Sequence, residues 1–428
     1  MDYELEEETP PAALVGMDAH SVSVSLCVTR WRRGWDPVVT KEITTDLKGL
    51  EATYAKRIPA GALTVLEAST NAFAIARRLE AIGHKVKVLA SDTAAGMSRR
   101  DRVNDRLDAR NLALAYASGK VREVHVPDPA HARLREVWFG YRNAVKDTVR
   151  WSNCLWGFCP MRGLELPKRS PAQKADGIRR AVAGKAWEGD DAFHAGMMLS
   201  EYAHALGTRD TYARKIDETV AADPRMARVM QVLGIRCVTA FALVAFIGDV
   251  RRFAAAKKLV SYVGLNPSVG SSGETEGPRR LSDCGRRDLK SLMVEAAQCA
   301  LARGNAPMHI WARRKIASGK ERNKVVCALA RKMLCHVWHV LMGHPAPCAE
   351  PDAPFRRKLA RLASRVGKEG RARLGHASAA AFVESVCATL RPQAGGEGEA
   401  PPSRPPASDE ARRRAPPAET TPKIIFST

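Results

Sequence analysis

Apolar and polar residues alternate with two different periods along the first 125 residues of the chain. An apolar run over residues 12–17 ends at Asp18, and apolar residues then occupy every second position from Val22 to Val28. A period of two is typical of a half-buried strand, because successive side chains point to opposite faces of a sheet. The pattern therefore predicts a hairpin whose first strand ends in an acidic residue.

Two further strands and a helix follow the predicted hairpin. The run Leu63–Leu66 ends at Glu67, an Ala-, Arg- and Leu-rich segment extends from Ala72 to Ile82, and apolar residues alternate again over 85–89. Strands that alternate with helices are typical of an α/β domain. We expect such a domain over residues 13–127, after an acidic N-terminal tail at residues 1–12.

The period changes to three or four residues between Pro129 and about Thr219. Residues 128–222 are therefore expected to form a helical hairpin or coiled-coil spacer, broken between residues 160 and 171. The spacer contains Trp138, Trp151 and Trp156. Aromatic side chains can stack on bases, but at helical spacing we expect these three to pack in a core.

A second, mostly helical domain is expected over residues 223–345. Two apolar segments meet at Gly234, and a second glycine turn follows at Gly248. This arrangement fits a helix-hairpin-helix, whose backbone amides can grip a phosphate, and it fits a plain helical hairpin equally well. Helices are predicted over 253–263, 286–303 and 323–341, with a Gly- and Ser-rich loop at 264–278.

Residues 346–428 lack a continuous core pattern. Phe355 to Arg373 is densely basic and compatible with a helix, whereas 393–421 is rich in Pro, Ala, Glu and Arg. Such composition is typical of disorder. We expect a basic, largely disordered tail, able to hold nucleic acid or simply solvated.

Four carboxylates occupy the positions at which a metal-dependent nuclease domain carries its acids. Asp18 and Glu67 end strands, and Asp105 and Asp108 open a helix, where a spacing of three places both on one face, roughly 5–6 Å apart. Carboxylate oxygens suit Mg²⁺, and two such ions can clamp the attacking and leaving oxygens of a phosphodiester. Taken singly, each acid can equally be a solvated residue or, for Asp105, a favourable charge at a helix start.

Composition favours a polyanionic partner. Lys and Arg number 68 against 46 Asp and Glu, which gives a net charge of +22 and an isoelectric point of about 9.9. The ten cysteines form no CxxC pair, the N-terminus does not have the pattern of a secretory signal, and no apolar run has the length of a membrane span. We expect a protein of the bacterial cytoplasm, associated with the nucleoid.

Together, the motifs resemble one family, the transposases of the bacterial insertion-sequence family 110. The matching segments contain the four acids and several glycine-rich stretches, namely residues 16–18, 66–69, 104–109, 233–240, 247–253, 262–267, 271–273 and 328–332. Their order and spacing run from about residue 14 to 342, roughly four-fifths of the chain.

The resemblance implies an RNase H/RuvC-like domain with a DEDD set of acids, followed by a transposase domain that contains a nucleophilic serine. The acids Asp18, Glu67, Asp105 and Asp108 would bind Mg²⁺, as two ions, and Ser272 would attack a DNA phosphate; Ser271 is the adjacent alternative. The resemblance also implies donor and target DNA, a guide (bridge) RNA encoded by the element, and a homo-oligomer, dimer or tetramer, whose protomers share the site. No membrane partner is expected.

Basic residues and two departures from the family pattern surround these motifs. Candidate nucleic-acid contacts are Gly234 in the glycine turn and the arginines beyond the serine loop, namely Arg279, Arg280, Arg286 and Arg287. A solvated basic face is the alternative for the arginines. Asp283 stands where many relatives have a basic residue, and His20 replaces a small or polar residue beside the first acid, where it either touches the site or packs.

Three functions fit these observations. The first is a transposase or recombinase that cleaves and rejoins DNA strands. The second is a hydrolytic RuvC-like junction nuclease that uses only the acids and water. The third is a nucleic-acid-binding protein without catalysis. The transposase hypothesis accounts for both the acids and the serine loop.

Overall fold

The computed structural model describes residues 13–31, 37–91, 105–119, 121–166, 171–268, 271–272, 275–276, 280–281, 284–344 and 352–390. Side chains are described throughout these ranges except at residues 105, 106, 171–174, 268, 271, 272, 275, 276, 280 and 352. No helix in these ranges is both long and apolar enough to cross a membrane.

A six-stranded mixed sheet forms the N-terminal domain, which confirms the predicted α/β class, although only four of the six strands were predicted. Its strands are β1 (Leu14–Ala19), β2 (Ser23–Arg30), β3 (Val38–Asp46), β4 (Leu63–Glu67), β5 (Lys85–Leu89) and β6 (Glu123–Val124), in the spatial order β3-β2-β1-β4-β5-β6. The first three strands form an antiparallel meander, and β1, β4 and β5 run parallel. The carboxyl ends of β1 and β4 therefore meet at one edge.

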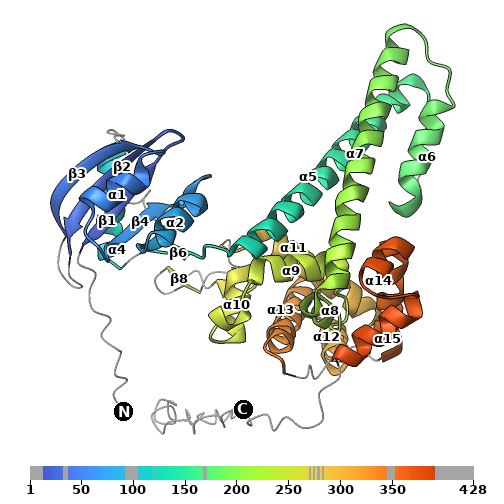
Figure 1. The fold of residues 1–428 in the computed structure, drawn as a ribbon. Helices are drawn as coiled ribbons and strands as arrows, with labels where there is room; N and C mark the ends of the chain where they lie inside the picture. The colour runs from blue at the N-terminus through green and yellow to red at the C-terminus, as the bar shows by residue number, and fades with distance from the viewer. Residues whose placement is uncertain are drawn as a thin grey trace, which may run out of the picture.

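Helices cover both faces of this sheet (Figure 1). On one face α1 (Leu50–Arg57) and α2 (Ala72–Ala81) pack against Val15 and Met17 of β1. On the other face α4 (Asp105–Ala117) packs against Leu14 of β1 and the alternate residues of β4. Alternation along β1 therefore divides the core into two layers.

A long helical hairpin follows, in the predicted spacer. It consists of α5 (Pro129–Phe158), the short 3-10 helix η1 (Pro160–Arg162), α6 (Pro171–Ala183) and α7 (Gly189–Ala222). Asp128 caps α5, because its carboxylate accepts from the backbone N–H groups of Ala130 and His131 at 3.0 Å. The break between α5 and α7 falls where Pro160 and Pro171 predicted it.

The hairpin has a small apolar core of its own near its tip. Leu155 of α5, Ile178 of α6 and Tyr202 of α7 are buried there, and Trp151 and Trp156 pack around them. Trp138, nearer the start of α5, belongs to the core of the C-terminal domain. All three tryptophans thus pack, as expected.

The C-terminal domain is built around a helix that is apolar at every position except Thr239. This helix, α9 (Cys237–Ile247), is buried at every position from Ala240 to Ile247. The helices that surround it are α8 (Pro224–Val229), η2 (Val250–Arg252), α10 (Ala256–Val263), α11 (Arg287–Arg303), α12 (Pro307–Ala317) and α13 (Arg322–Leu341). Helices α9, α10, α11 and α13 agree with the predicted helical segments, whereas α8, η2 and α12 were not predicted.

Residues 352–390 correct the prediction of a largely disordered tail. They form α14 (Asp352–Arg373), interrupted at Gly367, and α15 (Ala379–Leu390), which fold against the same core. Phe355, Leu359 and Leu362 bury one stripe of α14 at helical spacing. The dense basic charge obscured this stripe in the sequence. Residues 391–428 lie outside the described residues.

Basic side chains of α14 bind this helix to other parts of the protein. Arg365 donates to both carboxylate oxygens of Asp217 at 2.7 and 3.0 Å, and Asp217 on α7 is 93% buried. Arg373 donates to Glu218 at 3.0 Å, and Lys358 donates to the carbonyl oxygen of Met230 at 2.8 Å. Part of the positive charge that suggested a solvated tail is therefore used in packing.

Candidate active site

Asp18 and Glu67 lie side by side at the carboxyl edge of the sheet. Strands β1 and β4 are parallel neighbours, with Met17 opposite Leu66, so the acid that follows each of these residues occupies the next position in register. Leu14 and Val65 face α4, and side chains alternate along a strand. Asp18 and Glu67 therefore lie on the α4 face of the sheet.

A glycine brings α4 onto this face. A Cβ at Gly16 would lie 1.8 Å from the carbonyl oxygen of Ala109 and 3.0 Å from the backbone nitrogen of Ala113. Only a residue without a side chain permits the helix backbone to approach β1 so closely. Gly16 is two residues before Asp18 on the same face, so the close approach places the start of α4 over the two strand acids.

The start of α4 carries the remaining two acids of the predicted set. Asp105 is the first residue of the helix, and its side chain lies outside the described residues; Asp108 is one turn further and is partly buried. Burial raises the pKa of Glu67 above its ordinary value, and the negative charges of Asp18 and Asp108 raise this pKa further, against a hydrogen bond with Ser91 that lowers it. Three of the four predicted acids therefore share one electrostatic environment.

The donor chemistry of this group suits a hard divalent cation, which would relieve the mutual repulsion of the carboxylates. Among the described side chains, which omit that of Asp105, no three His, Cys, Asp or Glu residues are close enough together to hold a metal ion. The negative charges of Asp18 and Asp108 therefore act on Glu67, but these three described side chains do not form a closed coordination sphere.

Polar residues beyond the four acids hold this edge together. His20 Nε2 lies 3.2 Å from a carboxylate oxygen of Asp18, so His20 contacts the site. Asn71 donates to the carbonyl oxygen of His20 at 2.9 Å and accepts from Ser69 at 2.9 Å. The loops after β1 and β4 are thereby joined. No role was predicted for Ser69 or Asn71 from the sequence. The polar stretch between Glu67 and the next helix was the feature that could have indicated one.

The serine loop is a narrow β-hairpin rather than an irregular loop. Strands β7 (Pro267–Ser268) and β10 (Arg280–Leu281) pair at its base, and β8 (Ser271–Ser272) pairs with β9 (Thr275–Glu276) further out, with Ser272 opposite Thr275. The side chains of Ser271, Ser272 and Arg280 lie outside the described residues, as do Arg279 and Asp283 altogether.

Two glycines close the base of this serine hairpin. A Cβ at Gly264 would lie 2.2 Å from the carbonyl oxygen of Cys284, and one at Gly285 would lie 2.6 Å from the backbone nitrogen of Gly264. Both have positive φ, at +81° and +100°. The chain segments before β7 and after β10 can therefore touch.

The remaining predicted phosphate contacts have different surroundings. Arg287 is exposed at the first position of α11, whereas the guanidinium of Arg286 lies over the Phe246 ring, 4.0 Å from its centroid, and 3.4 Å from Asp288. Gly234 faces α11, where a Cβ would lie 2.3 Å from the carbonyl oxygen of Ala296. In this structure Gly234 permits close packing, and a phosphate contact through its turn stays a prediction.

The two halves of the candidate site are in different bodies of the chain. The acids belong to the sheet domain, and the serine hairpin extends from the helical domain; each domain has a separate hydrophobic core (Figure 1).

Comparison with known proteins gives a family match within the helical domain. Residues 226–310 match the model of the Transposase IS116/IS110/IS902 family. This part of the chain is therefore similar to the transposase domain of that family. The matched segment runs from α8 into α12 and includes the serine hairpin, and the resemblance predicted from the sequence is confirmed.

Curated relatives of the chain are transposases by name. A "probable family 20 transposase" of Pseudomonas aeruginosa is 24% identical over 287 residues, which cover 65% of this chain and 83% of that protein. The "putative transposase y4qE" of Sinorhizobium fredii is 26% identical over 293 residues, 67% of this chain and 71% of the relative. The transposase for the insertion sequence element IS1328 of Yersinia enterocolitica is 21% identical over 286 residues, 65% and 83% of the two chains.

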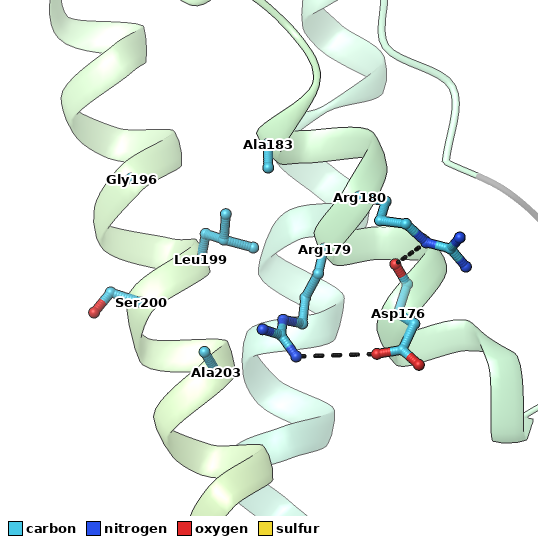
Figure 2. A pocket seen from close by; sticks show the side chains of 8 residues that line it. All are labelled: Asp176, Arg179, Arg180, Ala183, Gly196, Leu199, Ser200 and Ala203. Atoms are coloured by element: carbon cyan, nitrogen blue, oxygen red, sulfur yellow. Dashed lines mark hydrogen bonds and ion pairs between the residues drawn. The ribbon is translucent and has the colours of Figure 1, made fainter.

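A hollow of about 840 Å³ lies outside the transposase domain and outside the acidic edge, between α6 and α7 (Figure 2). Small residues of α7, including Gly196 and Ala203, form one wall. On the α6 side, Arg179 lies 3.9 Å from Asp176, and Arg180 donates to the carbonyl oxygen of Asp176 at 3.3 Å. These contacts lie within α6, and the hollow has no part in either half of the candidate site.

Proposed function

We propose that this protein is a DNA transposase of an insertion sequence, which cleaves and rejoins DNA strands through two cooperating half-sites. The first half-site is the group of carboxylates Asp18, Glu67, Asp105 and Asp108, which hold Mg²⁺ ions. The second is the serine hairpin, in which Ser272 attacks a DNA phosphate. The observation that carries the proposal is the register of the parallel strands β1 and β4, which places Asp18 and Glu67 side by side at one edge of the sheet, in a chain whose residues 226–310 match the IS116/IS110/IS902 transposase family.

The carboxylates would form a binding site for cations at the scissile phosphate. When bound, Mg²⁺ supplies Lewis-acid stabilisation of the charge that develops on the phosphate oxygens. Burial and the negative charges of Asp18 and Asp108 raise the pKa of Glu67, and a bound divalent cation would offset the repulsion among these carboxylates. The close approach of α4 at Gly16 holds the acids of the helix against those of the strands.

The serine supplies the nucleophile. A serine hydroxyl is weakly nucleophilic until it is activated, and a cation-bound phosphate is a better electrophile for it. Attack by Ser272 transfers the phosphate from the DNA sugar oxygen to the serine oxygen and releases a free strand end. A second strand end can then attack the phosphoserine and restore the phosphodiester. The reaction conserves the bond energy, as strand exchange requires.

The two half-sites meet between copies of the chain. Since they belong to bodies with separate cores, one protomer's acids can serve its partner's serine, and the protein acts as a homo-oligomer, a dimer or tetramer. An RNA encoded by the element guides the choice of donor and target DNA. The net charge of +22 suits this combined load of DNA and RNA.

The deciding experiment is capture of the covalent intermediate. Nicked DNA of the element end, incubated with the protein, its RNA and Mg²⁺, should give a protein–DNA adduct that survives denaturing electrophoresis. Ser272→Ala should lose the adduct, while Ser271→Ala and the exposed control Ser261→Ala on α10 should keep it. An adduct that needs Ser271 instead would move the nucleophile by one residue.

A mixing experiment tests the shared site. Asp18→Asn and Ser272→Ala proteins are each expected to be inactive, and a mixture should regain strand exchange because intact half-sites come from different protomers. Cleavage by Ser272→Ala alone would favour the hydrolytic nuclease. No cleavage by the unaltered protein, with DNA, RNA and Mg²⁺ all present, would favour a binding protein without catalysis.

A further inference from the structure

A cation-lined groove runs between α5 and the start of α11. Its α5 wall contains Phe139, Arg142 and Lys146, which lie on one side of the helix, and its other wall is residues 285–288. The hollow has a volume of about 340 Å³. Trp138 closes its floor, since its indole nitrogen donates to Asp288 at 3.0 Å.

The positive charge of the groove is not balanced by the described residues. Asp288 is the one acid in the lining, and it is engaged by Trp138 and by Arg286 at 3.4 Å. No described carboxylate forms an ion pair with Arg142, Lys146 or Arg287. Arg142 and Lys146 are four residues apart on α5, a spacing at which like charges lower helix stability. An anionic ligand would offset this repulsion.

An exposed aromatic ring stands beside these cations. Phe139 is 48% exposed, and its ring meets Phe246 edge-on, with 5.9 Å between the ring centroids. Phe246 is fully buried and fixes the position of this ring. An exposed, fixed ring next to cations is the combination on which single-stranded nucleic acid binds, because every base can stack on it while its phosphates meet the cations.

The groove is continuous with the serine hairpin. Strand β10 ends at Leu281, and the groove wall begins four residues later at Gly285, which touches Gly264 at the base of the hairpin. The backbone N–H of Arg286 donates to the carbonyl oxygen of Tyr262 at 3.2 Å, which fixes this connection. One wall of the groove therefore begins at the base of the serine hairpin.

We propose that the groove between α5 and α11 binds one DNA strand next to the phosphate that the serine attacks, with a base stacked on Phe139 and phosphates on Arg142, Lys146 and Arg287. The choice of DNA over RNA rests on the proposed function, since the strand presented to the serine is DNA. The groove therefore positions the strand, whereas the serine hairpin reacts with it.

Binding of a fluorescein-labelled, 20-nucleotide DNA single strand to the full-length protein tests the charge. Each phosphate contact contributes a slope of about −0.7 to the dependence of log K on log salt for single strands. The double variant Arg142→Ala, Lys146→Ala should therefore flatten the slope by about 1.4. Arg133→Ala, an exposed cation of α5 outside the groove, is the matched control and should leave the slope unchanged.

Stacking is tested at Phe139. Phe139→Ala should weaken binding of the same strand by at least about fivefold, because stacking of one base on an aromatic ring accounts for that much. Phe139→Trp should retain binding. The control Phe193→Ala, whose ring is 65% exposed on α7, should have no effect. A photo-reactive benzoylphenylalanine at position 139 should cross-link to nucleotides beside the scissile phosphate.

Several results would overturn the assignment. These are an unchanged salt slope in the double variant, equal losses in the Arg133→Ala and Phe193→Ala controls, or a loss of binding to a 20-nucleotide RNA without a loss for DNA. The readouts need no catalysis, so they are separable from the proposed function. If the variants change DNA binding as described but the unaltered protein exchanges no strands, the groove assignment is supported and the serine mechanism is wrong.

Discussion

Gly16→Ala is the sharpest test of how the fold builds the acidic half-site. The added methyl group would lie 1.8 Å from the carbonyl oxygen of Ala109, whereas ordinary contact begins at 3.4 Å, so α4 must retreat by about 1.6 Å. The obstructing atom is part of the helix backbone and cannot rotate aside. Overpacking of this kind costs about 1–3 kcal/mol of stability.

The functional loss should exceed the loss of stability. Helix α4 carries Asp105 and Asp108, and a displacement of about 1 Å at a reacting group costs on the order of 100-fold in rate. We expect Gly16→Ala to lower Mg²⁺-dependent strand cleavage by at least that factor while the protein stays folded. The measurements are single-turnover cleavage rates, Mg²⁺ binding by calorimetry, and amide hydrogen exchange in α4.

Gly207→Ala is the matched control. Gly207 lies within α7, and an added Cβ would meet nothing within 4 Å, so this change should raise stability by about 0.5–1 kcal/mol and leave cleavage unaltered. The reasoning would be refuted if Gly16→Ala cleaved DNA at the rate of the unaltered protein with unchanged exchange in α4. In that case the close approach at Gly16 would not position the acids.

Three further predictions follow from buried or repelling charges. Glu67→Gln should abolish cleavage. It should also raise the metal-free melting temperature at pH 7 but not at pH 4, because the raised pKa of Glu67 means that its ionised form destabilises the folded state as the pH rises. Equal melting temperatures for the variant and the unaltered protein at pH 7 would contradict this. Arg365→Met should cost about 2–3 kcal/mol in urea unfolding, since it leaves Asp217 buried without its partner, whereas Arg373→Met, at an exposed pair, should cost at most about 1 kcal/mol. The pKa of His309 is lowered by burial and by the nearby charges of Arg313 and His336. Below about pH 6.5 the unfolded chain therefore binds a proton that the folded chain does not bind, so the stability should decrease as the pH is lowered. His309→Leu should make this decrease smaller.

The α/β domain was predictable because its strands and helices are local patterns. The apolar runs of β1 and β4, the alternation over β2 and the helical spacing of α2 are local patterns, and each element lies within a few residues of its predicted place. The acids at the ends of these elements followed as well. Parallel strands bring their carboxyl ends to one edge, and the pairing of β1 with β4 places Asp18 and Glu67 side by side there.

Sequence alone misjudged the region beyond residue 345. The sequence was compatible with a helix over Phe355 to Arg373 but indicated a largely disordered tail, whereas α14 packs one apolar stripe against α7 and the core of the helical domain. Whether an arginine is solvated or paired depends on an acid far away in the chain; Arg365 and Asp217 are separated by 148 positions. Local composition contains no information about such a partner.

The sequence determined the elements, the residues available for chemistry and the family resemblance, because these depend on local periodicity and on short motifs. Only the tertiary structure decided that Gly16 admits α4 to the strand acids, that Ser272 lies on a narrow hairpin, and that Phe139 of α5 faces the start of α11. These relations depend on backbone approach between segments up to about 150 residues apart, as between Trp138 and Asp288. Such approach is set by packing of whole elements, which no single stretch of sequence specifies.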